Sequence, residues 1–344
     1  MKPIRLLIVD DSPLLRQVLV DMLGEEPDME VVGVARDGVE AVEMAKRLKP
    51  DVITLDVEMP RMSGLEALGS IMRENPTPVV MVSTKTSAGA EATIEALQKG
   101  AVDFVCKPRS GSFVALREVH QELAGKVRNA RNAVIGSRVA APVRAAMPTK
   151  VSDKVVLIAT STGGPKALTC LFETLPKNWQ VPILIVQHMP MGFTASLASR
   201  LDRLGTVACR EAADGDVLQP GLALLAPGGL HMRLEAGNRV NLFDGPTIHG
   251  VRPAADYLFE TGAKLYGSRC LAAVLTGMGK DGAAGALAIK KAGGLVLGEA
   301  ESSCTVYGMP RAAKEIGAIS GEYPIHEIGH ALVATAAGRL KGAA

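Results

Sequence analysis

Short apolar runs alternate with amphipathic stretches along the first 130 residues, and this alternation restricts the fold more than any other feature of the sequence. The runs are typical of strands and the stretches of helices, and in chain order they lie at residues 4–10, 13–24, 30–35, 38–48, 51–56, 64–75, 78–83, 90–99, 103–106 and 113–130. Five strand–helix units in succession predict a doubly wound parallel sheet, because parallel neighbours need a crossover helix between them.

A second pattern of the same kind begins at Lys154. Its predicted strands and helices lie at residues 155–160, 165–175, 181–187, 254–265, 270–275, 282–292 and 295–297. The middle of this region differs, with short apolar runs at 222–226, 231–234 and 240–243. The sequence Glu-Ala-Gly-Asn between the last two runs predicts a β-hairpin. We therefore expect a second doubly wound α/β domain with a β-hairpin insertion.

The segment between the two patterns is rich in Ala, Val, Arg and Pro and has weak periodicity. From residue 124, within the last predicted helix of the first pattern, to residue 150 the chain carries six basic residues and no acidic one. Such a segment is typical of a linker. The expected organisation is therefore a first domain at residues 1–128, a linker at 129–150 and a second domain at 151–344.

Composition excludes several classes of protein. The net charge of +2 gives no case for a nucleic-acid partner. The N-terminal apolar run is short and ends in two aspartates, so it resembles neither a signal peptide nor a membrane span. The five cysteines are odd in number and scattered, which favours a reducing compartment over a disulfide framework. We expect a monomeric cytoplasmic protein without membrane insertion.

Polar residues follow the apolar strands of the first domain, at Asp10, Asp11, Asp56, Ser83 and Lys107. Residues beyond the carboxyl ends of parallel strands gather in one crevice. Neighbouring carboxylates suit a hard divalent cation such as Mg²⁺, and Asp56 could then form an acyl phosphate. The hydroxyl of Ser83 and the ammonium of Lys107 could contact the phosphate oxygens. Any single aspartate could instead cap a helix, but the set of five favours the phosphorylation site.

Four motifs at these strand ends, "IVDDSP", "TLDVEMPRMSG", "VVMVST" and "DFVCKP", resemble the response-regulator receiver family. The resemblance covers the whole first domain and implies a flavodoxin-like sheet and phosphorylation of Asp56 by a histidine kinase. The Mg²⁺ ligands that it implies are Asp10, Asp11, Asp56 and the Glu58 carbonyl. The switch residues that it implies are Ser83, Phe104 and Lys107. Receivers often have Thr where Ser83 stands, a change that keeps the hydroxyl.

In the second domain the strand at 155–160 leads directly to Ser161, which is followed by Thr-Gly-Gly-Pro at a predicted helix start. A serine on a tight strand-to-helix turn is exposed, and the helix N-terminus favours developing negative charge. The same backbone amides could instead cradle a phosphate. Since the motif is neither GxSxG nor GxGxxG, it supports the nucleophile and the phosphate loop equally when taken alone.

Two further strand ends shift that balance. His188 follows the strand at 181–187, and Asp281 lies in a glycine-rich turn after the strand at 270–275. Alone, His188 is more often structural and Asp281 could be a helix N-cap. Together with Ser161 they supply a nucleophile, a base and a base-orienting carboxylate. For the other histidines we expect structural or surface roles, at His120, His231, His249, His326 and His330.

The chain order Ser, His, Asp differs from that of α/β-hydrolases. The motifs "ATSTGGP", "IVQHMP" and "LTGMGKDGAAG" instead resemble the protein-glutamate methylesterase family of bacterial chemotaxis, and with the receiver the resemblance extends over essentially the full chain. It implies hydrolysis of glutamate γ-methyl esters on chemotaxis receptors with release of methanol, and in some members deamidation of receptor glutamines. It also implies an oxyanion site at the backbone near Met278, no cofactor for the ester reaction, and a phosphorylation-gated receiver that covers the active site when unphosphorylated.

Two rival functions remain to be weighed. A receiver could control a DNA-binding output, but the second domain is too large for a typical helix-turn-helix module and lacks a basic recognition helix. Alternatively, "STGGP" and "GMGKDG" could be the phosphate loops of a nucleotide-binding module, yet neither fits the dinucleotide fingerprint. We favour the regulated hydrolase. For the basic linker a solvated connector is favoured over attraction to acidic receptor surfaces.

Overall fold

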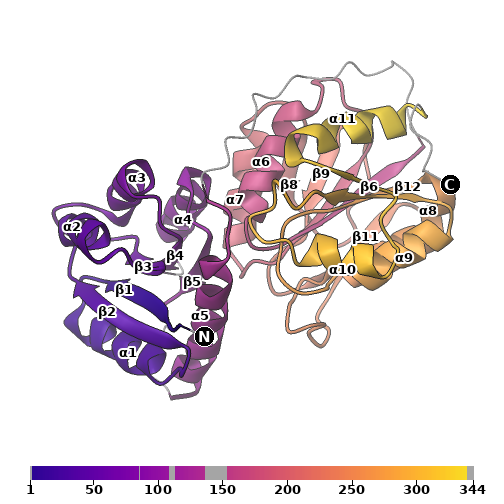
Figure 1. Cartoon of the computed structure of the whole chain (residues 1–344). Coiled ribbons are helices and arrows are strands. Elements are labelled where there is room, and N and C mark those ends of the chain that lie inside the picture. Colours follow the sequence, from indigo (N-terminus) through magenta and orange to yellow (C-terminus); the bar gives the residue numbers. More distant parts are fainter. Residues whose placement is uncertain (1, 85, 108–112, 136–152, 339–344) are drawn as a thin grey trace. The chain divides into compact units, whose positions relative to one another are not determined.

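The computed structural model describes residues 2–84, 86–107, 113–135 and 153–338 (Figure 1). The chain divides into two compact units, Met1–Ser137 and Arg138–Ala344. Most of the predicted linker at 129–150 lies outside the described residues. Each unit is therefore considered by itself.

Among the described residues of the first unit, five parallel strands form one sheet in the order β2-β1-β3-β4-β5. Helices α1 and α5 pack on one face, and α2, α3 and α4 pack on the other (Figure 1). The elements are β1(Ile4–Val9), α1(Pro13–Gly24), β2(Met29–Ala35), α2(Gly38–Leu48), β3(Val52–Asp56), α3(Gly64–Glu74), β4(Val79–Ser83), α4(Ser87–Lys99), β5(Asp103–Cys106) and α5(Phe113–Arg131). This strand order is that of flavodoxin-like sheets, and it confirms the predicted five-unit receiver fold.

Local sequence explains why these elements begin where they do. Strands β3 and β4 are buried along their whole length, as expected for a parallel sheet covered on both faces. Ser63 caps α3 in a capping box with Glu66, which fixes the helix start. Gly64 follows at a close approach, since a Cβ there would lie 1.9 Å from the Asp56 carbonyl oxygen. The start of α3 is thus pressed against the strand end that carries Asp56.

The second unit is built on a larger parallel sheet. Within residues 153–338, seven strands pair in the order β14-β13-β12-β6-β7-β9-β8, and β10 and β11 form a separate antiparallel pair. The elements are β6(Val155–Thr160), α6(Gly164–Thr174), β7(Ile183–Gln187), α7(Phe193–Asp202), β8(Ala208–Glu211), β9(Leu222–Leu225), β10(His231–Glu235), β11(Arg239–Phe243), α8(Ala255–Tyr266), β12(Cys270–Val274), α9(Ala283–Lys291), β13(Leu295–Glu299), α10(Met309–Glu315), β14(Gly321–Tyr323) and α11(Ile325–Ala336), with a short 3-10 turn at Gly267–Arg269. The predicted doubly wound second domain is confirmed.

The predicted hairpin is β10 and β11, whose strands pair in antiparallel register from His231↔Phe243 to Glu235↔Arg239. The run at 222–226 lies elsewhere, because β9 pairs in parallel with β7 and β8 in the large sheet. Five elements have no counterpart in the sequence predictions: α7, β8, α10, β14 and α11. The strands among them are three or four residues long and mostly not buried, so they show little apolar periodicity.

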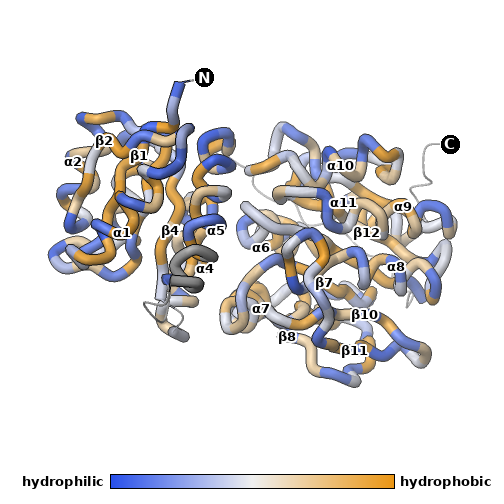
Figure 2. Tube along the Cα trace, turned by 90° about the horizontal axis from the view of Figure 1, so that it is seen from below, coloured by the Kyte–Doolittle hydropathy of each residue, from blue (hydrophilic) through white to orange (hydrophobic). Residues whose placement is uncertain are grey.

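Helices cover both faces of the second sheet, with α8, α9 and α10 packed together on one side and α6, α7 and α11 on the other (Figure 1). Figure 2 shows that the tube is orange along central strands such as β1 and β4, whereas blue segments recur along the helices and loops around them. Apolar residues from β6, β12 and α8 form one continuous core in the second unit. None of the described helices is long and apolar enough to span a bilayer.

Candidate active site

Neighbouring strands deliver the predicted nucleophile and base to one edge of the second sheet. Strand β6 lies between β12 and β7. Thr160 is in register with Gln187, so Ser161 and His188 leave adjacent strands at the same level. Strand β12 ends just before the loop that carries Asp281. The carboxyl ends of these three strands therefore bring Ser161, His188 and Asp281 to one crevice.

The main chain of Ser161 is bonded to both neighbouring strands. Its amide donates to the Thr276 carbonyl at 3.0 Å, and its carbonyl accepts from the Gln187 side-chain amide at 3.0 Å. The carbonyl also accepts from the Gly164 amide at 2.8 Å, which closes the turn. Gly163 has φ 80° and would place a Cβ 2.4 Å from Thr305 Oγ1. Gly163 is therefore required by a left-handed turn and by close packing.

His188 and Asp281 form a hydrogen-bonded pair. Nε2 of His188 lies 2.7 Å from Oδ2 of Asp281, and their side chains are 9% and 2% exposed. The Asp281 carboxylate also accepts from the amides of Ala255 at 2.6 Å and Asp256 at 3.2 Å, at the start of α8. Burial alone would raise the pKa of Asp281, but the bonds from His188 and these amides hold it below its usual value. Asp281 is therefore a carboxylate at neutral pH.

The pairing with Asp281 determines the roles of the two nitrogens of His188. The nitrogen that faces a carboxylate carries the proton, so Nε2 is the donor and Nδ1 of the neutral ring is the acceptor. Among the described side chains, no hydrogen bond joins Ser161 to His188. Such contacts often tighten only when substrate binds. What the pair can do chemically is take up a proton at Nδ1 while Asp281 stabilises the resulting cation.

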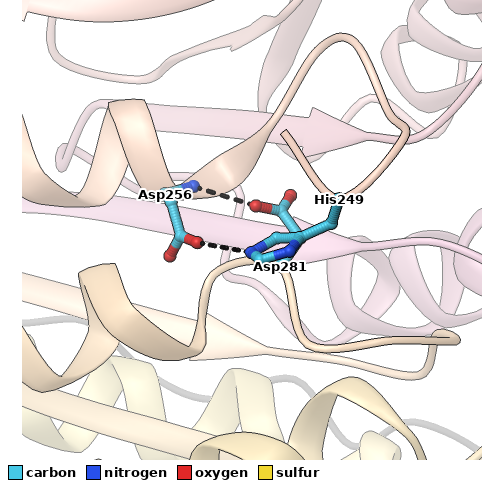
Figure 3. A group of neighbouring side chains, drawn as sticks. All are labelled: His249, Asp256 and Asp281. Carbon is cyan, nitrogen blue, oxygen red and sulfur yellow. Dashed lines mark hydrogen bonds and ion pairs between the residues drawn. The ribbon is translucent and has the colours of Figure 1, made fainter. Parts of the chain in front are cut away.

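A second His–Asp pair lies beside Asp281 (Figure 3). Nε2 of His249 is 3.4 Å from Oδ2 of Asp256, whose Oδ1 accepts from the buried Gly285 amide at 2.8 Å. His249, Asp256 and Asp281 could each offer one ligand atom within 4.8 Å. Each carboxylate oxygen of the two aspartates, however, already has a hydrogen-bond or ion-pair partner. The group is satisfied by protein atoms alone.

Behind Ser161 lies a buried carboxyl group that the sequence did not single out. Glu299 ends β13, is 1% exposed, and accepts from the Thr276 amide at 2.8 Å and from the Ser303 hydroxyl at 3.0 Å. Burial is the main cause that raises the pKa of Glu299 to about 7. Thr276 is the residue whose carbonyl holds the Ser161 amide. Glu299 thus supports the strand end on which the serine rests, while Met278, the predicted oxyanion residue, has a half-exposed side chain.

The first unit brings its predicted residues together in a different way. Asp10 and Asp56 are buried, and Nζ of Lys107 lies 2.9 Å from Asp10 Oδ2 and 2.7 Å from Asp56 Oδ2. With Asp11, which is exposed, they offer carboxylate oxygens within 4.8 Å of one another. Burial raises the pKa of Asp56 to about 6, although the Lys107 ammonium lowers it. Three carboxylates against one ammonium leave excess negative charge, which fits a hard divalent cation.

The remaining predicted residues of the first unit have partners of their own. The Ser83 hydroxyl donates to the Gly89 carbonyl at 3.2 Å and accepts from Thr93 at 2.8 Å, so it is bonded to α4. The amide of Glu58 donates to Asp56 Oδ1 at 3.4 Å. Phe104 is buried in β5 with the Lys126 ammonium 5.1 Å from its ring centroid.

Comparisons with known proteins agree with this division. A model of the CheB methylesterase family matches residues 156–332, and a model of the response regulator receiver domain matches residues 6–116. A protein of Pyrococcus abyssi named protein-glutamate methylesterase/protein-glutamine glutaminase is 44% identical over 346 residues, covering 96% of this chain and 93% of its own. A Thermotoga maritima protein of the same name is 46% identical over 336 residues, covering 96% and 98%. The crystal structure of the Thermotoga maritima CheB methylesterase catalytic domain is 42% identical, with a TM-score of 0.52, and covers 54% of this chain and 100% of that one.

Proposed function

This chain belongs to the CheB methylesterase family of hydrolases and carries a response regulator receiver domain, and from this premise we propose that it hydrolyses glutamate γ-methyl esters on chemotaxis receptors when its receiver is phosphorylated. The observation that carries the proposal is the His188–Asp281 hydrogen bond beside the strand end that presents Ser161. The names of the relatives join methylesterase with glutaminase. Deamidation of receptor glutamines is therefore the second candidate reaction, because an amide carbonyl can be attacked at the same site.

The reaction begins with Ser161. Its Oγ attacks the ester carbonyl while Nδ1 of His188 takes up the hydroxyl proton. Methanol then leaves with that proton, and a water molecule activated by His188 hydrolyses the acyl-enzyme. Nδ1 is assigned as the base because Nε2 is bonded to Asp281.

Asp281 and the backbone near Met278 stabilise the charges that develop. Asp281 holds the ring of His188 in one tautomer and offsets the positive charge of the imidazolium. The backbone amides near Met278 are proposed to donate to the tetrahedral oxyanion, a contribution of about 3–4 kcal/mol per donor in comparable hydrolases. No cofactor is required by these steps.

In the receiver, Asp56 is the proposed phosphoryl acceptor and a histidine kinase the donor. Mg²⁺ would be held by Asp10, Asp11, Asp56 and the Glu58 carbonyl, and when bound it supplies positive charge that screens the incoming phosphoryl group. Lys107, which already contacts Asp56, would bond a phosphate oxygen. If Ser83 does the same, its hydroxyl must leave the Gly89 carbonyl of α4, and phosphorylation is thereby coupled to that helix.

We further propose the domain limits 1–128 and 151–344 with a linker at 129–150, a monomeric state, and a cytoplasmic location, where the kinase and the receptor substrates would be met. In the absence of phosphate the receiver restrains the hydrolase. The second unit expressed from about Lys150 onward should therefore be more active than the unphosphorylated full-length chain, and equal rates would refute the restraint.

One experiment tests both domains. Methanol release from methylated receptor membranes is measured with Mg²⁺ and acetyl phosphate for the full-length chain and for Ser161→Ala. We expect release by the wild type that rises with the phosphodonor, and none by Ser161→Ala. The matched control is Ser302→Ala, because Ser302 is exposed and has no part in the mechanism. Release that persists in Ser161→Ala would refute the serine assignment.

A further inference from the structure

We propose that Asp256 is a positioning residue for this hydrolase: its carboxylate joins the N-terminus of α8 to the first turn of α9 and so holds Asp281 against His188. The inference deepens the proposed function and rests on it in one respect, the role of Asp281 as the partner of His188. Nothing in the chemistry requires Asp256 to touch the substrate. Its effect reaches the reaction through Asp281.

The first support is the contact between two helix starts. Asp256 is the second residue of α8, is 5% exposed, and its Oδ1 accepts from the amide of Gly285 at 2.8 Å. Gly285 lies in the first turn of α9, where backbone amides have no partner within the helix. The residue before α9 is Gly282, which has no side chain to cap it. Asp256 therefore supplies, from another helix, an acceptor that α9 lacks locally.

The second support is that the exchange is reciprocal. Asp281 lies in the turn that leads into α9, yet its carboxylate accepts from the amides of Ala255 and Asp256 at the start of α8. Each helix start is thus capped by an aspartate that belongs to the other. Figure 3 shows the amide of Asp256 directed at the Asp281 carboxylate, while its own carboxylate is directed at His249. Removing the Asp256 carboxylate frees the turn that carries Asp281.

The third support is the close packing of the two helices at this point. A Cβ on Gly285 would lie 2.5 Å from Cβ of Phe259 and 3.3 Å from Cα of Asp256. A Cβ on Gly282 would lie 3.3 Å from Cβ of Ala255. These contacts set the separation at which the Asp256 carboxylate meets the Gly285 amide. A small shift between the helices would move Asp281 relative to His188.

The charges around Asp256 agree with a held rather than a free carboxylate. Burial and the neighbouring Asp281 carboxylate raise the pKa of Asp256, whereas the Gly285 amide and His249 lower it. His249 adopts φ 53° and is about one-third exposed, so its ring reaches Asp256 from the solvent side. A second group, His231, accepts from the Ala254 amide through Nδ1 at 3.1 Å, next to the same helix start. Side chains therefore satisfy three successive amides, those of Ala254, Ala255 and Asp256.

The test compares Asp256→Ala with Asp256→Asn in the full-length chain. Asn keeps an oxygen that can accept from Gly285, whereas Ala removes it. The readout is the rate constant at which a small phosphonofluoridate reagent modifies Ser161, because this rate reports activation by His188 without any receptor. We expect Ala to lower this rate and kcat for methanol release by about 10- to 100-fold with little change in KM, as a displaced catalytic group does. Asn should recover most of the loss.

The pH profile separates positioning from general loosening of the fold. If Asp281 is displaced, the imidazolium of His188 is less stabilised, and the acid limb of the modification rate moves to lower pH in Asp256→Ala. The matched control is Glu260→Ala, an exposed carboxylate on the same helix, which should behave as wild type. If Asp256→Ala lowers the fraction of folded protein, Asp256→Ser is used in its place. Each measured rate is divided by the fraction of that variant that is folded. A wild-type rate and pH profile in Asp256→Ala, or in Asp256→Ser where it replaces Ala, would overturn the inference, and so would an Asn variant no faster than Ala. If the wild type released no methanol from methylated receptors but its Ser161 still reacted with the phosphonofluoridate, the proposed substrate would be refuted and the role of Asp256 would not.

Discussion

Asp56 in the first unit and Asp281 in the second are both buried aspartates at the carboxyl end of a parallel sheet, yet their pKa values move in opposite directions. Burial raises the pKa of Asp56 to about 6, because the Lys107 ammonium offsets the rise only in part and the neighbouring Asp10 carboxylate adds to it. The pKa of Asp281 is held low by a histidine and two backbone amides. A buried carboxylate surrounded by fixed donors keeps its charge, whereas one that shares a single ammonium needs a further cation.

The difference matches the chemistry proposed for each site. A residue that orients a base must remain charged and motionless through every turnover, and backbone amides provide that. A residue that accepts and releases a phosphoryl group must change its partners, and Lys107 on a flexible stem allows it. The same type of sheet thus supports one permanent site and one switchable site.

The largest expected effect tests the permanent site. Asp281→Asn should lower kcat for methanol release by about 10⁴-fold, because an amide at this position favours the wrong tautomer of His188. The matched control is Asp153→Asn, since Asp153 is 72% exposed and pairs with Arg269 rather than with Ser161, His188 or Asp281. A loss of less than about tenfold would mean that Asp281 is merely a cap for α8.

The next effect concerns Glu299, whose pKa of about 7 lies above its usual value of 4.5. A raised pKa stabilises the fold at low pH, and this contribution is lost as pH rises through about 7. The difference corresponds to at most about 3 kcal/mol. Unfolding by urea at pH 5 and pH 8, followed through the sole tryptophan, Trp179, should show wild type losing stability that Glu299→Gln keeps. Parallel pH curves for the two proteins would contradict this.

The switchable site is tested by Asp56→Asn. Acetyl phosphate with Mg²⁺ should raise the wild-type rate by about tenfold, within the usual range of coupling free energies, and should leave the variant unaffected. The control is Asp51→Asn. Asp51 lies directly before β3 and accepts from the Arg5 amide, so this variant also removes a receiver carboxylate but leaves Asp56 in place. Activation that survives in Asp56→Asn would remove the proposed acceptor.

The smallest effect is expected from Ser83→Ala. This change deletes the hydroxyl bonded to Gly89 and Thr93, and a hydrogen bond of this kind is worth about 1 kcal/mol. The activation ratio should therefore fall by about fivefold while phosphate incorporation at Asp56 continues. Ser83→Thr, which keeps the hydroxyl, should restore it. An unchanged activation ratio in Ser83→Ala would mean that the bonds from Ser83 to α4 play no part in the activation.

Much of the fold was accessible from the sequence, because parallel strands buried on both faces appear as short apolar runs and their ends carry the polar residues. Ser161 and His188 could be placed in this way. The pairs that support them could not, since Asp256 meets Gly285 and Glu299 meets Thr276 through packing between elements 23 to 29 residues apart. Edge strands such as β8 were missed because they are short and partly exposed, so their sequences show no clear run or alternation of apolar residues. The partners of Ser83 could not be predicted either, because the sequence does not say which of several nearby groups a hydroxyl will bond.

The main-chain bonds of Ser161 have a consequence for regulation. Since the amide and carbonyl of this serine are tied to the strand ends on both sides, its Cα stays in register with the sheet, and only rotation about χ1 moves the hydroxyl. The sheet therefore leaves the backbone of the serine little room to move between an active and an inactive position. Under the proposed function, control would then act on the access of the substrate to the serine, and it could change during evolution while the residues of the catalytic site stay the same.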